Sequence, residues 1–284
     1  MIITKVIGGL GNQMYQYAIG RAISIKNNSH LKVDISDFSD YKLHNGYRLD
    51  AFNIDVKIAT KSEVINMKGS DSLISRLLRR FFPLYKPQYY KEKGHTCYDT
   101  SVYMYDSIYL DGYWQNSRYF DDIRETLIND FSLKSALSEN ADQIMSIINS
   151  SESVGLHVRR GDFLKHSDVG VLDIAYYQRA VSYISNNVTN MGDIKFFVFS
   201  NDIAWCKNNL SFITNCTFVD NTESELEDLL LMSNCKHNII ANSSYSWWAG
   251  WLNDNQAKIV IYPAQWMKVN PNNYTWGLDD WIKL

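Results

Sequence analysis

The chain has 284 residues, of which 45% are hydrophobic and 21% charged, and its formal net charge at pH 7 is −3. This length suits one large or two medium domains, with ample material for a core. The small negative charge argues against a general nucleic-acid binder. Aromatic residues make up 14% of the chain, which suits a sugar-binding cleft but equally suits plain packing.

The four cysteines are Cys97, Cys206, Cys216 and Cys235, and no two of them are spaced as C-x-x-C. This spacing favours buried free thiols in a reducing compartment over a zinc site or a disulfide framework. Residues 2–7 read as a strand rather than a signal peptide. No apolar run approaches the ~18–20 residues of a membrane-spanning helix. We therefore expect a soluble, cytoplasmic protein.

The first strand runs into a glycine-rich turn, Gly8 to Gln13, and a helix begins near Met14. Strand, turn and helix start place backbone N–H groups at one point, which makes an anion site. Met14 stands where a dinucleotide fingerprint needs its third glycine, and no Gly-Lys-Ser/Thr follows, so neither nucleotide motif is present. The glycines alone fit equally well a tight turn that needs positive φ. The polar pair Asn12 and Gln13 favours a functional turn.

A second strand is predicted at residues 31–35, and residues 36–75 show little pattern. Residues 76–93 are basic and aromatic. A solvated face is the preferred interpretation. The alternative is a patch that lies on a membrane surface, near a lipid-linked acceptor.

Helical spacing predicts a helix from an N-cap at Ser117 to Phe131, and another over about residues 135–149. The polar stretch from Asn149 to Glu152 then indicates a domain junction. From there apolar strands alternate with helices, including a helix at about 173–187. The predicted strands are 153–158, 194–199, 217–219, 237–241 and 258–262. This alternation predicts a doubly wound parallel sheet.

Four polar clusters directly follow apolar strands. They are Gly8 to Gln13, His157 to Asp162, Ser200 to Asp202 and Asn242 to Ser244. In parallel sheets such strand ends lie on one edge, where ligands bind. Guanidinium groups suit phosphates, and carboxylates suit ribose hydroxyls or base N–H groups, so the clusters predict a nucleotide diphosphate site. Each cluster alone could be a surface ion pair or a helix N-cap. Their recurrence at equivalent strand ends favours the functional interpretation.

The helix carrying Trp247, Trp248 and Trp251 reads as a core face more readily than as a sugar platform. His237, at the start of a strand, is expected to be structural. The chain has no Asp-x-Asp and no His/Cys group with metal-ligand spacing. We therefore expect no metal, and expect arginine to neutralise a leaving diphosphate.

Four stretches together resemble the α-1,2-fucosyltransferases of glycosyltransferase family 11, in their bacterial form. The stretches are Gly8 to Ala18, His157 to Phe163, Phe197 to Asp202 and Asn242 to Trp248, and their order and spacing agree over nearly the whole chain. The resemblance implies an α/β, GT-B-like fold with two Rossmann-type halves, parallel sheets and a cleft between them. The expected domains are 1–150 on the acceptor side, 151–265 holding GDP-fucose, and a tail, 266–284, that packs back on the body.

The implied activity is the inverting, metal-independent transfer of L-fucose from GDP-fucose to the 2-hydroxyl of a galactose in a glycan acceptor, without cofactors. Arg159 would bind the β-phosphate and His157 would lie near the guanosine. The implied catalytic residues are Arg159, Asp162 and His157. The implied donor-binding residues are Gly11, Asn12, Gln13, His157, Arg159, Arg160, Ser200, Asn201, Asp202, Asn242, Ser243, Ser244 and Ser246. The resemblance also implies a cytoplasmic location, with contact at the inner face of the membrane as a further expectation.

Arg159 is the expected stabiliser of charge on the leaving diphosphate. Asp162 is either the base that activates the acceptor or the residue that orients an arginine, and both roles stay open. One alternative function is a GDP-fucose-dependent transferase with another acceptor linkage, on a protein or a chitin oligosaccharide; such enzymes lack the Asn-Ser-Ser-Tyr-Ser-Trp-Trp run. Another is a non-catalytic module that binds a nucleotide sugar or a glycan.

Overall fold

The computed structural model describes residues 1–41, 43–69, 88–94, 97–165, 168–188, 194–269 and 276–284. Contacts divide the chain into two compact units, Met1–Lys134 and Ser135–Leu284. Most of the basic and aromatic stretch at 76–93 lies outside the described residues.

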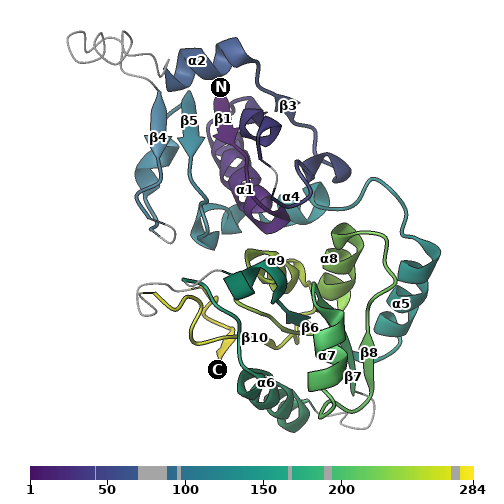
Figure 1. The fold of residues 1–284 in the computed structure, drawn as a ribbon. Coiled ribbons are helices and arrows are strands. Elements are labelled where there is room, and N and C mark those ends of the chain that lie inside the picture. Colours follow the sequence, from purple (N-terminus) through teal and green to yellow (C-terminus); the bar gives the residue numbers. More distant parts are fainter. Residues whose placement is uncertain (42, 70–87, 95–96, 166–167, 189–193, 270–275) are drawn as a thin grey trace. The chain divides into compact units, whose positions relative to one another are not determined.

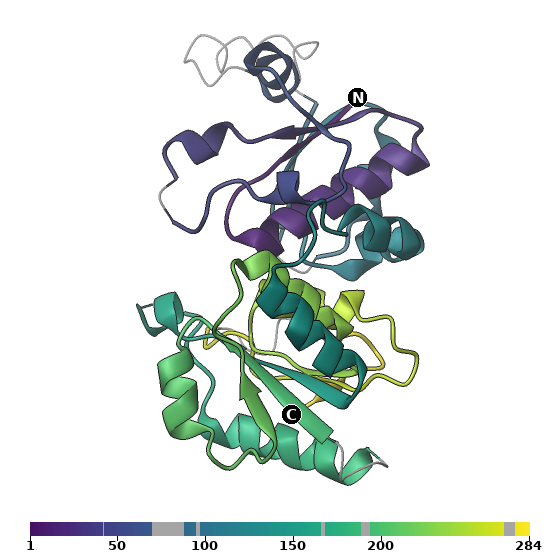
Figure 2. The same ribbon diagram turned by 90° about the vertical axis from the view of Figure 1, so that its right-hand side faces the viewer.

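The first unit is a five-stranded parallel sheet with strand order β3-β2-β1-β5-β4 (Figure 1). Its strands are β1 (Ile2–Lys5), β2 (Leu31–Asp34), β3 (Lys57–Ile58), β4 (Tyr89–Lys91) and β5 (Ile108–Asp111). Its α-helices are α1 (Leu10–Lys26), α2 (Lys61–Lys68) and α4 (Arg124–Asp130). Figure 2 shows α1 lying along the sheet, and the helix buries both apolar and amide side chains there.

The sequence did not predict β3, β4 or β5, which have only two to four residues. The helix expected from Ser117 is also wrong in its first turns. Two 3-10 turns, Ser117–Tyr119 and Asp121–Ile123, precede α4. The side chain of Asn116, rather than Ser117, caps the first of them, because it accepts from the Arg118 N–H at 3.2 Å.

The second unit is a six-stranded parallel sheet with order β11-β10-β9-β6-β7-β8, so the parallel, doubly wound sheet predicted from the sequence is confirmed. Its strands are β6 (Glu152–Val158), β7 (Ile194–Ser200), β8 (Cys216–Phe218), β9 (His237–Ile239), β10 (Val260–Tyr262) and β11 (Ile282–Lys283). Its α-helices are α5 (Glu139–Asn149), α6 (Ile174–Asn187), α7 (Ile203–Asn209), α8 (Glu225–Asn234) and α9 (Ser244–Leu252).

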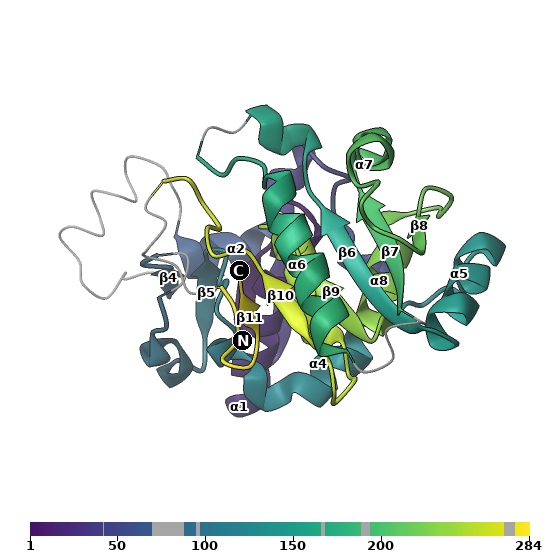
Figure 3. The ribbon, with the colours of Figure 1, turned by 90° about the horizontal axis from the view of Figure 1, so that it is seen from below.

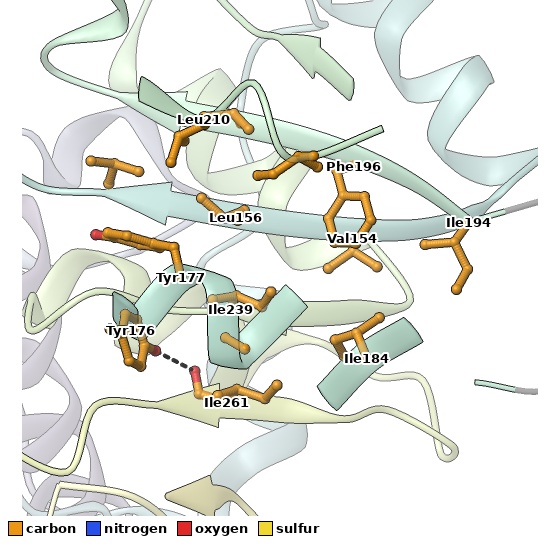
Figure 4. Close-up of a cluster of buried hydrophobic side chains, with 14 of the residues drawn as sticks. Val154, Leu156, Tyr176, Tyr177, Ile184, Ile194, Phe196, Leu210, Ile239 and Ile261 are labelled. Atoms are coloured by element: carbon orange, nitrogen blue, oxygen red, sulfur yellow. Dashed lines mark hydrogen bonds between the residues drawn. The ribbon is translucent and has the colours of Figure 1, made fainter. Parts of the chain in front are cut away.

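The two faces of this sheet bury different side chains of β6, because successive side chains alternate. Val154, Leu156 and Val158 pack against α6 and α7 in one buried cluster. Figure 3 shows α6 in front of the sheet, and Figure 4 shows the cluster, in which the Tyr176 hydroxyl donates to the Ile261 carbonyl at 3.3 Å. The opposite face of β6, with His157, is therefore directed to the side of α8 and α9.

The second unit begins at Ser135, which is earlier than the domain junction expected near residue 150. The buried Glu227 of α8 accepts hydrogen bonds from the Ser138 N–H at 2.6 Å and from the Ser138 hydroxyl at 3.1 Å. Ser138 also caps α5, so α5 is anchored to α8 and belongs to the second unit. At the other end, β11 pairs with β10.

Candidate functional site

The order of the second sheet reverses between β6 and β9. From β6 the chain builds outward to β7 and β8, and then returns to place β9 on the other side of β6. Outside the carboxyl ends of the two strands that flank such a reversal lies the crevice where open α/β sheets bind ligands. The clusters predicted at residues 157–162 and 242–244 follow these two strands, and the cluster at 200–202 follows the adjacent β7.

His157 is the penultimate residue of β6, and its side chain is buried, with 4% exposure. Its ring centroid lies 5.5 Å from that of Tyr245 in the first turn of α9. The ring atom Nδ1 is buried and has no hydrogen-bond partner among the described residues. Burial, and secondarily the nearby Arg159 charge, lowers the pKa of His157 to about 3, so the imidazole is neutral at physiological pH.

Arg159 follows β6 and is held by the turn that it begins. Its Nη2 lies 2.9 and 3.0 Å from the two carboxylate oxygens of Asp162, and the guanidinium carbon lies 5.2 Å from the centroid of the Phe163 ring. The Nε atom is buried without a hydrogen-bond partner among the described residues. The guanidinium is thus oriented from one side and keeps a donor for an anionic ligand.

Arg160 has a different environment from its neighbour. Its Nε donates to Asp202 at 3.1 Å, and its guanidinium carbon lies 4.0 Å from the Trp205 ring centroid. The backbone N–H of Arg160 donates to the Asn201 side chain at 3.0 Å. These contacts connect the end of β6 to the start of α7. They occupy the Nε donor, one face of the guanidinium and the backbone N–H of Arg160, so few of its groups remain for a ligand.

The cluster after β7 largely stabilises this junction. The Ser200 hydroxyl accepts from the Asp202 N–H at 2.9 Å, and Asp202 caps α7 by accepting from the Trp205 N–H at 3.2 Å. Asn201 is exposed, and its amide fills the space that a side chain at Gly161 would need, 2.3 Å from the position of an added Cβ atom. Ser200, Asn201 and Asp202 therefore lie at the predicted edge, but mostly as supports of the charged turn.

The third cluster forms the start of α9, a nine-residue helix. Ser243 is the N-cap and accepts from the Tyr245 N–H at 3.3 Å. Ser244, the first helical residue, is half-buried, so its hydroxyl and the helix N-terminus are available to an anion. Ser246 is fully buried and bonds weakly to the Ala241 and Ser243 carbonyls, so it faces the interior rather than a ligand.

Asn242 connects the end of β9 to two loops. Its Nδ2 donates to the Gly170 carbonyl and to the Trp266 carbonyl, both at 3.1 Å. Its Oδ1 is buried without a hydrogen-bond partner among the described residues. Asn242 therefore positions both loops beside the strand end and leaves one acceptor for a hydroxyl or N–H group of a ligand.

Two further residues at this edge were given no role by the sequence reasoning. Tyr245 contacts His157, and its hydroxyl donates to the Glu225 carbonyl. Asp228, in the first turn of α8, accepts from the Thr222 hydroxyl at 2.8 Å. Burial raises the pKa of Asp228 to about 6. The acidic run that opens α8 is visible in the sequence, but by itself it predicts only the start of a helix.

We expect Asp228→Asn to stabilise the protein by about 1–3 kcal/mol at pH 7.5. The carboxylate has a pKa near 3.8 when unfolded and about 6 when folded, so folding is penalised as pH rises through this window. The asparagine carbonyl can still accept from Thr222. Urea denaturation at pH 7.5 checks the gain, which should vanish near pH 4. A variant no more stable than the parent at pH 7.5 would contradict the proposed burial cost.

In the first unit the turn is shorter than predicted, because α1 begins at Leu10 rather than near Met14. The turn also follows a strand of the first sheet, so it does not share the sheet edge of the other three polar clusters. The side-chain amides of Asn12 and Gln13 have different roles. Gln13 is fully buried, donates to the carbonyls of Gly8 and Gly46 at 2.9 and 2.8 Å, and accepts from the Arg48 N–H at 2.9 Å. It is a structural clamp. Asn12 is half-buried, and its Oδ1 accepts from Gln115 at 2.9 Å. Gly11 lies buried in the first turn of α1.

His237 and the tryptophans are structural, as the sequence indicated. His237 starts β9 at the amino edge of the sheet; its Nε2 lies 3.0 Å from Glu152, and its Nδ1 accepts from the Ile259 N–H at 3.0 Å. Trp247, Trp248 and Trp251 are at most 2% exposed. In the part of the chain that the structure describes, no three His, Cys, Asp or Glu side chains are grouped as metal ligands. Among those same residues, no helix has the length and apolarity to cross a membrane.

The two parallel sheets define a GT-B-like α/β fold. The model of glycosyl transferase family 11 matches residues 1–282, and the chain therefore belongs to this family. Similar proteins include an α-1,2-colitosyltransferase of Escherichia coli, 33% identical over all of this chain and 99% of that protein. The O-antigen biosynthesis glycosyltransferase WbnK of Escherichia coli is 31% identical, over 98% of each chain.

More distant relatives share part of the chain. A galactoside α-(1,2)-fucosyltransferase 1 of Rattus norvegicus is 29% identical over 50% of this chain and 41% of that protein. Among solved structures, the fucosyltransferase NodZ from Bradyrhizobium matches with a TM-score of 0.51 and 12% identity, covering 87% of this chain and 91% of that one. At this identity the likeness concerns the fold alone.

Proposed function

We propose that the protein transfers L-fucose from GDP-fucose to the 2-hydroxyl of a galactose residue, with inversion and without a metal. The observation that carries the proposal is the site at the β6–β9 reversal. It combines an arginine held from one side, a helix N-terminus and the buried neutral imidazole of His157. A cation and a helix N-terminus suit the two phosphates of a nucleotide diphosphate.

In the proposed step, the acceptor oxygen bonds to the anomeric carbon of fucose from the face opposite GDP. The bond from that carbon to the β-phosphate oxygen breaks, and its electron pair leaves with GDP. Arg159 and the start of α9 stabilise the charge that grows on this oxygen. The hydroxyl proton passes to a carboxylate or to water. Asp162 places both oxygens on Arg159, which favours an orienting role for it over that of base.

The acceptor is proposed to be a galactose-terminated glycan of the cell surface, assembled on a lipid carrier in the cytoplasm. The O-antigen relative supports this class of acceptor. The similarity to the colitosyltransferase over the whole chain supports GDP-colitose as a second candidate donor. Colitose is L-fucose without its 3-hydroxyl, so the same site chemistry serves GDP-colitose, and the two donors are separated by experiment.

We expect GDP release from GDP-fucose when lactose is present, and a product with fucose on the galactose 2-hydroxyl. A 2-deoxygalactoside is the matched control, because it lacks only the accepting group and should give no product. The assay is repeated with GDP-colitose, and NMR of the product gives the linkage. If product forms only with GDP-colitose, the proposed donor is wrong and GDP-colitose takes its place. If fucose is attached at another hydroxyl, the proposed linkage is wrong. Calorimetric GDP binding without turnover on any galactoside would favour a binding module.

A further inference from the structure

Two loops of the first unit hold residues with left-handed backbone. Outside glycine, the described residues with positive φ are Asn28, His44, Trp114 and Asn215. For the two asparagines this conformation is ordinary in turns. Trp114, at φ 57°, is a bulky residue, for which such a backbone costs about 1–3 kcal/mol. His44 and Trp114 belong to the loops after β2 and β5, which follow the two strands paired with β1.

The Trp114 loop is fixed by a carboxylate. Glu92 accepts from the N–H groups of Tyr113 and Trp114 at 2.7 and 3.0 Å. A side chain at Gly112 would meet Glu92, 2.4 Å from the position of an added Cβ atom. The backbone conformation is thus held in place, and it brings Gln115 to Asn12, where Gln115 Nε2 donates to Asn12 Oδ1 at 2.9 Å.

The loop after β2 carries an aromatic cluster. Phe38 contacts Tyr41 and Tyr47 edge to face, with ring centroids 5.8 and 6.2 Å apart, and the centroid of Tyr41 lies 6.0 Å from that of His44. The exposed His44 ring lies over Gly9, 3.6 Å from where a Cβ atom would be. Gln13 fixes the loop through its bonds at Gly46 and Arg48.

His44, Gly9, Asn12 and Gln115 therefore form one surface, which we call the glycine-turn platform. The imidazole lies beside Gly9, and the amide pair lies beside the neighbouring Gly8, where Asn12 Nδ2 is 3.0 Å from the position of an added Cβ atom. Asn12 Nδ2 can donate and Gln115 Oε1 can accept, and neither has a partner among the described residues. None of the four residues that define the platform is Lys or Arg, so these residues suit a neutral ligand with neighbouring hydroxyls rather than a diphosphate.

We infer that the glycine-turn platform binds the galactose residue of the acceptor. The inference rests on the proposed function and assigns its acceptor subsite. The amide pair donates to one sugar hydroxyl and accepts from another, while the flat His44 ring packs against the apolar C–H face of the sugar. The anion site expected at this turn is replaced by a site for an uncharged sugar.

The test compares His44→Ala and Gln115→Leu with His30→Ala. His30 is also exposed, but it precedes β2 at the opposite edge of the sheet. Initial rates of GDP release give separate KM values for lactose and GDP-fucose. We expect the lactose KM to rise about 5- to 100-fold in Gln115→Leu and about 2- to 10-fold in His44→Ala. The KM for GDP-fucose should stay within about twofold, and His30→Ala should match the parent for both substrates.

Two outcomes separate the inference from the proposed function. Unchanged lactose KM in both variants, or an equal rise in both KM values, would overturn the platform as an acceptor subsite while transfer by the parent stands. Should the parent transfer fucose to no galactoside, saturation-transfer NMR with methyl β-galactoside decides the inference alone. Contact signals in the parent that are lost in His44→Ala and Gln115→Leu would support it, and signals retained in both would refute it. Thermal denaturation checks that each variant is folded.

Discussion

Replacing Arg159 by alanine is expected to lower turnover by about 10²–10³-fold at saturating substrates. Arg159 is a preorganised cation with a buried, unpaired Nε among the described residues, and Asp162 holds its Nη2 in place. Its removal leaves the growing charge on the departing diphosphate without its main partner. Rates of GDP release measure the loss in kcat, and calorimetry with GDP measures how much of it is binding.

Two arginine variants give this experiment its contrast. Arg160→Ala removes the same side chain one residue later, but there the guanidinium supports Asp202 and Trp205, so the larger change is expected in Tm. Arg179→Ala, on the exposed face of α6, should match the parent in both. Near-parental turnover in Arg159→Ala would remove Arg159 from the proposed mechanism. A loss in Arg160→Ala as large as in Arg159→Ala, at unchanged Tm, would show that the two arginines share the role.

His157 is expected to make the stability of the protein fall with acid. Its pKa is near 6.5 when unfolded and about 3 when folded, because the buried ring excludes the charged form. The unfolded chain therefore binds the extra proton, and the stability contribution is present above pH 6.5 and is lost as pH falls toward 3. Between pH 7.5 and pH 5.5 this one group lowers the free energy of unfolding by about 1.4 kcal/mol.

The comparison with His157→Gln isolates this group from other titrating residues. Urea denaturation of both proteins at pH 7.5 and 5.5 gives four free energies of unfolding. The parent should lose about 1.4 kcal/mol more than the variant between the two values. Equal losses would mean that His157 titrates normally in the folded protein, and they would contradict the expected effect of burial on its pKa.

The long strands β6 and β7 and the three-residue strands β8, β9 and β10 could be predicted from the sequence, but the short strands β3, β4, β5 and β11 could not. β6 and β7 each have seven residues with nearly continuous apolar side chains. β3 and β11 have two residues each, and their place is fixed by pairing with β2 and β10. Pairing of this kind joins segments far apart in the chain, and it leaves no periodic pattern in so few residues.

The location of the site could be predicted from the sequence, but the roles of its individual residues could not. Polar clusters after β6, β7 and β9 do lie at neighbouring strand ends. The family resemblance singled out Arg159, but the residue types alone could not show that Arg159 keeps a free donor while the contacts of Arg160 are internal. The sequence also could not show that Gln13 and Ser246, both expected to bind the donor, are fully buried. Such differences depend on which way each side chain leaves the backbone and on what it meets there.

The pairing of β11 with β10 has a consequence for how the protein is made. The first sheet draws all its strands from residues 2–111, so it can be completed while the ribosome is still translating the rest. The second sheet takes its edge strand from Ile282 and Lys283, and the Ala264 N–H donates to the carbonyl of Leu284. The second sheet can therefore be completed only once residues 282–284 have left the ribosome, whereas the first needs only residues 2–111.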